Sequence, residues 1–342
     1  MAKKWFSLVL VITVVSLLAA CGNGAGKNGT TNNTGGNTAA NTSAADSYPE
    51  KNIEFIVPFS AGGVSDILTR SFVEAATGII DTTITVKNVN GGSGTVGNYE
   101  LVRAKPDGYT WLWAATGHLS SALHITPAEY TMEDYTIVNK IGDMVGIIVV
   151  PKNSPFQTLE DLINHAKANS GELTIGNPGE ATVVAMLAYL LEDRTEATFQ
   201  HVPFQGSGEL LPAVLGGHVD AGIMNVPEVA SQVAAGELRA LAVLSENRVD
   251  QLPDVPTISE AGVDGVSGGA GHFIVIPNNV DPAIVAKIDE LTKKVYESDK
   301  FKELMAQAGY QLGYKNAEDS RAEVEAWYQA TGEIYEKLGK TK

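Results

Sequence analysis

Nine stretches of the chain are rich in β-branched and aromatic residues and predict strands. They occupy residues 52–59, 83–89, 109–116, 145–150, 173–177, 198–204, 218–224, 238–245 and 272–277. Helical patterns lie between most of these stretches. This alternation is typical of an α/β protein built on parallel sheets.

Helical periodicity is clearest in three places. Residues 158–168 have Thr158 as a candidate N-cap and an apolar face made of Leu159, Leu162, Ile163 and Ala166. Residues 281–298 begin with Asp281 as N-cap and Pro282 in the first turn, and their apolar face is made of Ile284, Ile288, Leu291 and Val295. The chain is expected to end in a helix that stops near Gly339 and turns inward Val324, Trp327, Tyr328 and Tyr335.

Most predicted strands end in a polar or glycine-rich loop. Six of these loops are PFSAGGVSD, NGGSGTVG, AATGHLS, GNPGEAT, PFQGSGE and MNVPE. In open α/β sheets a ligand lies beyond the carboxyl ends of the strands. The loops therefore predict a cleft between two α/β domains.

The first of these loops is the best candidate for an anion site. Residues 56–70, IVPFSAGGVSDILTR, pass from a strand through a glycine turn into a helix. The free amides from Gly62 to Ser65 and the helix dipole would favour a carboxylate, while Asp66 fixes the loop or a bridging water. Capping of the helix by Ser65 and Asp66, without any ligand, is the alternative.

The N-terminus has the pattern of a secretory signal peptide over residues 1–20. Lys3 and Lys4 precede an apolar run from Trp5 to Ala20. The run could also be a short membrane anchor, although it is marginal for a span of ~20 residues. Leu18-Ala19-Ala20-Cys21 resembles the bacterial lipobox, which predicts that Cys21 is lipidated. Because Cys21 is the single cysteine of the chain, no intramolecular disulfide is possible.

Residues 21–46 are expected to form a disordered tether between this lipid anchor and the folded part. They consist almost entirely of small and polar residues, with no aromatic side chain. The remaining residues, about 47 to 342, suit two domains. The 342-residue chain carries 24 Lys and Arg against 40 Asp and Glu, a net charge of −16. Nucleic acid is therefore an improbable partner, and any anion must be held by local dipoles and hydrogen bonds.

Three patterns that resemble catalytic or metal-binding motifs are incomplete in this chain. Gly92, Gly94 and Gly97 have the spacing of a dinucleotide-binding turn, but the next strand ends without the carboxylate that would hold the ribose, so we interpret the loop as a wall of the cleft. Ser207 lacks the glycine spacing of a nucleophile elbow. No metal-ligand spacing links the six histidines, which are expected on the surface or in packing: His118, His124, His165, His201, His218 and His272. No catalytic residue, metal or cofactor is predicted.

Five further stretches together resemble one family. They are YPEKNIEFIVPFSAGGVSD, PDGYTWLW, HVPFQGSGELLPAVLGGHVDAG, GELRALAVLSENR and LPDVPTISEAG, in the order of the family and spanning residues 48–262. They resemble the Bug-type substrate-binding proteins of tripartite tricarboxylate transporters. The resemblance implies a type II periplasmic-binding-protein fold, with two α/β lobes and a ligand cleft between them. The expected lobes are 47–145 plus 247–342, and 146–246.

The resemblance also implies the function. The protein is expected to be exported and lipid-anchored to the outer face of the cell membrane, or periplasmic, and to be a monomer. It would capture a small organic carboxylate and deliver it to integral membrane transporter subunits. An exported enzyme acting on an organic acid, and a sensor that presents the ligand to a signalling protein, are the alternatives. The expected ligand-binding residues are Phe59, Ser60, Gly62, Gly63, Val64, Ser65, Asp66, Thr116, Asn177, Thr182, Phe204 and Asn225.

The second lobe departs from the family pattern. Family members often have a Ser-rich turn with a histidine, similar to G-S-S-G-x-G-S-x-x-H, where this chain has IGNPGEATVVAM. The usual P-Y-K-G loop is PFQG here, and GVSGGAGHFIVIP lacks the tryptophans common at that place. Because Glu180 is gained in the first of these loops, a second carboxylate is disfavoured nearby. The far end of the ligand is therefore expected to be neutral, polar or cationic more often than anionic.

Overall fold

The computed structural model describes residues 45–341. The expected signal peptide, the lipidation site at Cys21 and all but the last two residues of the expected tether lie outside the described residues. Within residues 45–341, no helix has both the length and the apolar character needed to cross a membrane.

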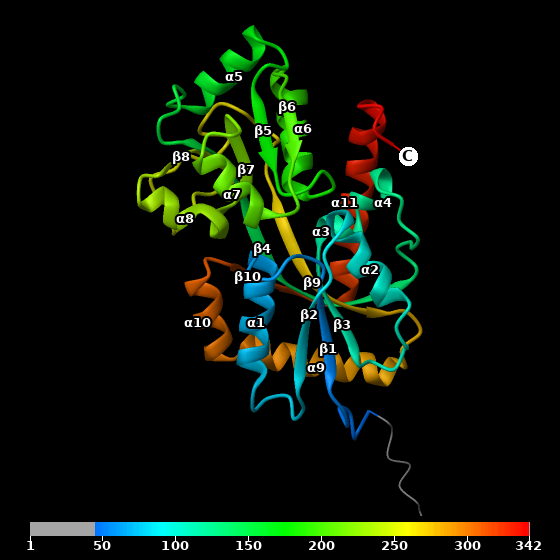
Figure 1. The fold of residues 1–342 in the computed structure, drawn as a ribbon. Helices are drawn as coiled ribbons and strands as arrows, with labels where there is room; N and C mark the ends of the chain where they lie inside the picture. The colour runs from blue at the N-terminus through cyan, green and yellow to red at the C-terminus, as the bar shows by residue number, and fades with distance from the viewer. Residues whose placement is uncertain (1–44, 342) are drawn as a thin grey trace, which may run out of the picture. The chain divides into compact units, whose positions relative to one another are not determined.

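In the part of the chain that the structure describes, ten strands form two sheets that share the long strand β4 (Figure 1). The strands are β1 (Ile53–Val57), β2 (Ile84–Asn88), β3 (Thr110–Ala115), β4 (Tyr135–Pro151), β5 (Thr174–Asn177), β6 (Gln200–Pro203), β7 (Ala221–Asn225), β8 (Leu238–Leu244), β9 (Gly269–Pro277) and β10 (Gln311–Lys315). The first part of β4 pairs with β9 and β10, and its last part pairs with β7 and β8. We call the β2-β1-β3-β9 side the first lobe and the β7-β5-β6 side the second lobe.

Parallel pairing, predicted from the alternation of strands and helices, holds only for the outer strands. β1 is parallel to β2 and β3, and β5 is parallel to β6 and β7. The strands next to β4 are antiparallel to it. For β4 and β9 the reason is the path of the chain. It passes from the first lobe to the second along β4 and returns along β9, so the two strands run in opposite directions.

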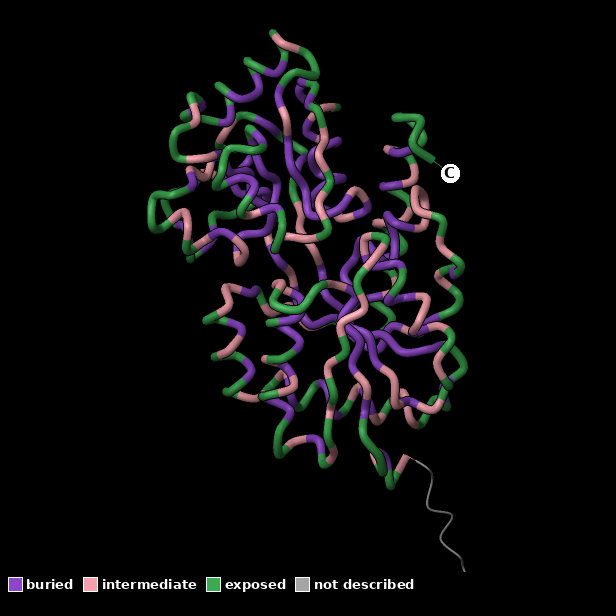
Figure 2. Tube along the Cα trace, viewed as in Figure 1, coloured by how far each residue is buried: buried purple, intermediate pink, exposed green. Residues whose placement is uncertain are grey.

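Helices cover both faces of each sheet. They are α1 (Val64–Ala76), α2 (Thr95–Val102), α3 (Thr116–Leu119), α4 (Ala122–Ile125), α5 (Leu159–Ala168), α6 (Val183–Thr195), α7 (Ser207–Leu215), α8 (Val226–Ala234), α9 (Pro282–Glu297), α10 (Asp299–Gln307) and α11 (Ala317–Lys337), with a 3₁₀ turn η1 at Gly92–Gly94. In the first lobe, α1, α9 and α10 pack on one face, and α2, α3 and α11 on the other. In the second lobe, α5 and α6 oppose α7 and α8. Buried residues follow the strands through both lobes (Figure 2).

The three helices with clear sequence periodicity form as predicted. Thr158 Oγ1 accepts a hydrogen bond from Asp161 N at 3.1 Å and caps α5, and Asp281 caps α9 through Ala283 N at 2.8 Å. In α11, Val324 and Tyr335 are fully buried, whereas Trp327 and Tyr328 are only partly buried. Gly339 has a φ of 65°, as expected just beyond a helix C-terminus.

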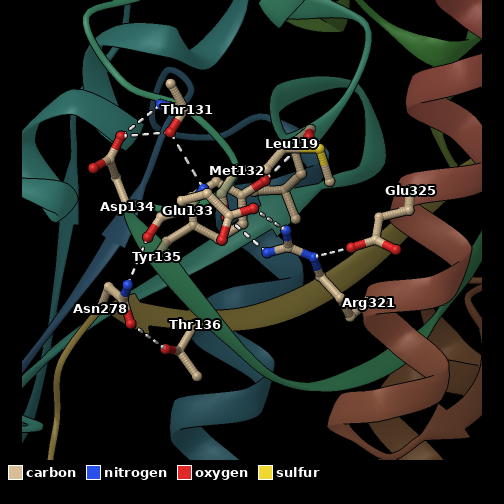
Figure 3. Close-up of polar contacts among 10 residues, drawn as sticks. All are labelled: Leu119, Thr131, Met132, Glu133, Asp134, Tyr135, Thr136, Asn278, Arg321 and Glu325. Atoms are coloured by element: carbon tan, nitrogen blue, oxygen red, sulfur yellow. Dashed lines mark hydrogen bonds and ion pairs between the residues drawn. The ribbon is translucent and has the colours of Figure 1, made fainter.

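Helix α11 contacts both lobes. Figure 3 shows Arg321 near its start, which donates to Met132 O at 2.7 Å and pairs with Glu133 at 2.8 Å, immediately before β4 in the first lobe. Its later residue Tyr335 lies in the core of the second lobe, and Lys337 pairs with Asp193 of α6. Helix α11 therefore joins the two lobes outside the shared strand β4.

Residues 249–266 pack with the second lobe. Val249, Leu252 and Val255 join the core beneath α7 and α8, and Val263 and Val266 join the core beneath α6. The sequence-based limits placed this segment in the first lobe. The packing favours a return of the chain to the first lobe near Gly268. We therefore propose that the second lobe extends to about residue 267 and not to residue 246.

Candidate functional site

The turn between β1 and α1 is held in place by Asp66. Its carboxylate accepts hydrogen bonds from Gly62 N at 2.9 Å, Arg70 Nε at 3.0 Å and Asn88 Nδ2 at 3.0 Å. Asn88 Nδ2 also donates to Phe59 O at 3.0 Å. Burial alone would raise the pKa of Asp66, but these hydrogen bonds lower it below its ordinary value of 3.8. Asp66 is therefore an ionised support of the turn.

The N-terminus of α1 is not capped by a side chain. Gly63 is the N-cap residue, and no side chain caps the helix. Neither Ser65 nor Asp66, the capping residues of the alternative interpretation, acts as the N-cap, and Asp66 instead accepts from Gly62 N in the preceding turn. The first N–H groups of an α-helix have no partner within the helix, so those of Val64 and Ser65 are available to an anion.

This turn forms one wall of a cavity of about 340 Å³ that lies between the two lobes. The first lobe contributes the turn, the end of β3 with α3, and the start of β9. The second lobe contributes the starts of α6, α7 and α8. The lining residues are Phe59, Ser60, Ala61, Gly62, Gly63, Val64, Ser65, Ala115, Gly117, His118, Met144, Pro178, Thr182, Val183, Val184, Gln205, Gly206, Ser207, Gly208, Glu209, Asn225, Glu228, Ala270 and His272.

Most of the expected site residues lie together on this cavity. Those that line it are Phe59, Ser60, Gly62, Gly63, Val64, Ser65, Thr182 and Asn225. Asp66, Thr116, Asn177 and Phe204 lie behind the wall. Thr116 donates to Gly271 O at 3.2 Å, and Asn177 Oδ1 accepts from Gly179 N at 3.0 Å. Phe204 packs beside Gly176, whose added Cβ would lie 3.3 Å from the ring. These four residues shape the loops without lining the cavity.

Sequence reasoning missed two histidines at the site. His118 and His272 are each 1% exposed and line the cavity, because Ala115 at the end of β3 pairs with His272 in β9. Burial lowers the pKa of both imidazoles to about 3, so both are neutral. His118 Nδ1 lies 3.3 Å from Ala115 N and accepts its hydrogen, which puts the ring proton on Nε2. Spacing along the sequence gives no sign of this pair. The two histidines are far apart in the chain and become neighbours only through the antiparallel pairing of β3 with β9.

The far wall carries carboxylates that the sequence did not single out. Glu209 of α7 and Glu228 of α8 both line the cavity, whereas no lysine or arginine of residues 45–341 does so. Burial raises the pKa of Glu228 above its ordinary value. Glu228 could have been suspected from its place three residues after Asn225, which is the spacing of a capping box.

Glu180 does not face the ligand, contrary to the expectation. It lies outside the cavity lining, and its carboxylate pairs with Lys340 at 2.8 Å. The loop at residues 91–97 was also expected to be a wall of the cleft, and none of its residues lines the cavity. An added Cβ on Gly94 would lie 2.3 Å from His118 Nε2, so this glycine makes room for the imidazole instead.

The site therefore combines hydrogen-bond donors on one side with carboxylates on the other. The turn of the first lobe offers backbone N–H groups and a helix dipole, both suited to an anion. The buried histidines add no positive charge. This arrangement can hold a small polar molecule between two lobes.

Comparison with known proteins gives the same picture. Residues 68–340 match the model of the "Tripartite tricarboxylate transporter family receptor" family. The "UPF0065 protein in gbd 5'region" of Cupriavidus necator is 31% identical over 300 residues, which are 87% of this chain and 90% of that protein. The solved structure of the periplasmic binding protein BugD has a TM-score of 0.80 and 26% identity, covering 86% of this chain and 100% of its own.

A second solved structure, R. palustris Rpa4515 with adipate, has a TM-score of 0.80 and 25% identity, covering 85% of this chain and 98% of its own. These matches confirm the predicted α/β fold with two lobes. The family and its solved members are receptors for solutes and not enzymes, which sets aside the alternative of an exported enzyme. The chain belongs to the receptor family of the tripartite tricarboxylate transporters.

Proposed function

We propose that the protein captures a small organic carboxylate in the cavity between its lobes and delivers it to the membrane subunits of a transporter. The observation that carries the proposal is the uncapped N-terminus of α1, which opens onto this cavity. The relative Rpa4515 was solved with adipate, a carboxylate, which supports the same ligand class.

The carboxylate is held without an ion pair in this proposal. Arg70, in the second turn of α1, is paired with Asp66 and does not line the cavity. The ligand would instead accept hydrogen bonds from the N–H groups at the start of α1, where the helix dipole adds a favourable field. Such a site would select among carboxylates by their shape and hydrogen bonding. Because the contacts are local, it could bind an anion despite the net negative charge of the chain.

Export and attachment to the membrane complete the proposal. A signal peptide over residues 1–20 and a lipid on Cys21 would place the lobes on the outer side of the cell membrane. The receptor would act there as a monomer. Residues 22–45 would act as a tether of about 25 to 30 Å by random-coil scaling. This reach would keep the loaded receptor close to its membrane partners.

Ligand-dependent stability and compaction test this function. A panel of mono-, di- and tricarboxylates would be screened by thermal unfolding, with native mass spectrometry of the purified protein to detect retained solute. A true ligand at a hundredfold excess over its Kd should stabilise the protein by about 2.7 kcal/mol. Small-angle scattering should show closure of the lobes. A panel that produces neither effect would contradict the proposal.

A graded series at Gly63 tests the position of the carboxylate. Gly63 has an ordinary φ of −74°, and an added Cβ would have only Ser60 O nearby, at 3.3 Å. Gly63→Ala should weaken binding, and Gly63→Leu should abolish it, because the larger side chain fills the approach to the helix N-terminus. The unliganded melting temperature controls for folding. Undiminished affinity in a folded Gly63→Leu variant would show that the carboxylate binds elsewhere.

A further inference from the structure

The far wall of the cavity is built from hydrogen-bond acceptors around Glu228. Its Oε1 accepts from Ser207 Oγ at 2.8 Å and from Asn225 Nδ2 at 3.2 Å, and its Oε2 accepts from Asn225 N at 2.8 Å. Ser207, Asn225 and Glu228 all line the cavity. The starts of α7 and α8 thus fix the carboxylate in one orientation.

Glu228 retains capacity for one more donor. A carboxylate has about four acceptor positions, and three are filled here, so the open one is on Oε2. No cation among residues 45–341 forms an ion pair with Glu228, and burial raises its pKa. Glu228 is half-buried, so its carboxylate has lost part of its hydration without gaining a counter-charge, and a cation supplied from the cavity would stabilise it.

Asn225 supplies an independent second acceptor at the same place. The residue is 4% exposed, and its Oδ1 is buried without a hydrogen-bond partner in the described part of the chain. Its orientation follows from the contact with Glu228, because the amide must direct Nδ2, not Oδ1, toward a carboxylate. An unpaired buried carbonyl oxygen beside an incompletely paired carboxylate calls for a donor.

From these two observations we infer that the solute has a hydrogen-bond donor at the end opposite its carboxylate, and that an ammonium group is the donor that fits best. An ammonium group has three N–H donors and one positive charge, which match Glu228 Oε2, Asn225 Oδ1 and the missing counter-charge. The inference rests on the proposed function, since the carboxylate at α1 orients the solute. It makes the ligand an aminocarboxylate and not a dicarboxylate.

The other charges of the cavity agree with this ligand. Glu209, the second carboxylate of the wall, is exposed and accepts a hydrogen bond from Gln205 N at 3.3 Å. With neutral histidines and no lysine or arginine in the lining, a dicarboxylate would bring a second negative charge next to two carboxylates. Repulsion between these like charges would disfavour binding of a dicarboxylate.

Length-matched solute pairs test the inference directly. Kd would be measured by calorimetry for 4-aminobutanoate against succinate, 5-aminopentanoate against glutarate, and 6-aminohexanoate against adipate. In at least one pair the amino member should bind about tenfold or more tightly, as expected for hydrogen bonds to a charged group. Glu228→Gln should remove that preference. Glutamine can still accept the hydrogen bond from Asn225 N, so the variant keeps the helix start while losing the charge.

Glu180→Gln is the matched control, because Glu180 lies outside the cavity lining and should not alter the ranking. Tighter binding of the dicarboxylate in every pair, or an unchanged preference in Glu228→Gln, would overturn the inference and leave the proposed function standing. If none of the six solutes binds, the inference fails as well. Loss of all carboxylate binding across the wider panel would mark the failure of the function itself.

Discussion

Asp66 is the residue on which the geometry of the anion site depends. It contacts the turn through Gly62, the helix through Arg70 and strand β2 through Asn88. Only 5% of its side chain is exposed. An amide at this position could accept fewer of these hydrogen bonds and would carry no charge for Arg70.

Asp66→Asn should therefore destabilise the fold by about 1 to 3 kcal/mol, the usual cost of leaving buried polar partners unsatisfied. Because the pKa of Asp66 is lower in the folded protein than its ordinary 3.8, the ionised form stabilises the fold above that pH. The stability difference between the native protein and Asp66→Asn should be complete near neutral pH and should shrink as the pH falls below about 4. Denaturant unfolding at several pH values measures it, and a pH-independent difference would show that the charge of Asp66 is unimportant.

At the scale of elements, close contact between α3 and the start of α6 brings the lobes together beside the cavity. Gly117 makes this contact possible, because an added Cβ would lie 2.7 Å from Ala181 O and 3.2 Å from Thr182 Cα. Backbone atoms cannot move aside as a side-chain end can. The sequence gives no sign of this constraint, since Gly117 has no need for a positive φ.

Gly117→Ala should hold the two lobes apart at this point. We expect an unliganded protein that folds normally, a solute affinity lowered about tenfold or more, and incomplete compaction by small-angle scattering in saturating ligand. Gly313→Ala is a suitable control, because its Cβ would meet Asp143 Oδ2 at 3.4 Å and Gly142 Cα at 3.8 Å, both ordinary contact distances. Equal affinity in Gly117→Ala and Gly313→Ala would show that this approach is not required for binding.

At the scale of the whole molecule, the two lobes are joined by more than the shared strand β4. Helix α11 is tied to the first lobe by Arg321 and packs Tyr335 into the core of the second. Lys340, just after this helix, pairs with Glu180 beside the start of α6. Any opening of the cavity must therefore pivot near α11 or break these contacts.

The proposed lipid anchor also acts on the whole molecule. Cys21→Ser should release the receptor from the membrane fraction or leave it unprocessed, because serine cannot carry a thioether-linked lipid. Its unfolding curve should match that of the native lobes, since Cys21 precedes the described residues. Cell fractionation and mass spectrometry of the N-terminus measure the outcome. An unmodified, uncleaved N-terminus in native cells would contradict the lipobox interpretation.

Local sequence patterns were enough to predict most strands and the three helices α5, α9 and α11. Features that depend on residues close in sequence could be predicted from the sequence alone. They are the N-caps at Thr158 and Asp281, the turn before α1 and the helix end at Gly339. The first half of β4 and strand β10 were missed. Lys140 and Asn139 interrupt the apolar pattern of β4, and they are buried there because Lys140 pairs with Glu323 of α11 and Asn139 binds Asp289 of α9.

The sequence by itself determined the α/β class, the glycine turn that ends at an open helix N-terminus, and the family. Only the tertiary structure decided what faces that turn. Antiparallel pairing of β3 with β9 brings His118 close to His272. Asn225 and Glu228, at the start of α8, lie on the opposite wall. Glu180 pairs with Lys340 outside the cavity. The physical reason is that helix capping and strand propensity act within a few residues, whereas the charge and donor balance of a cavity is the sum of side chains from segments far apart in the chain.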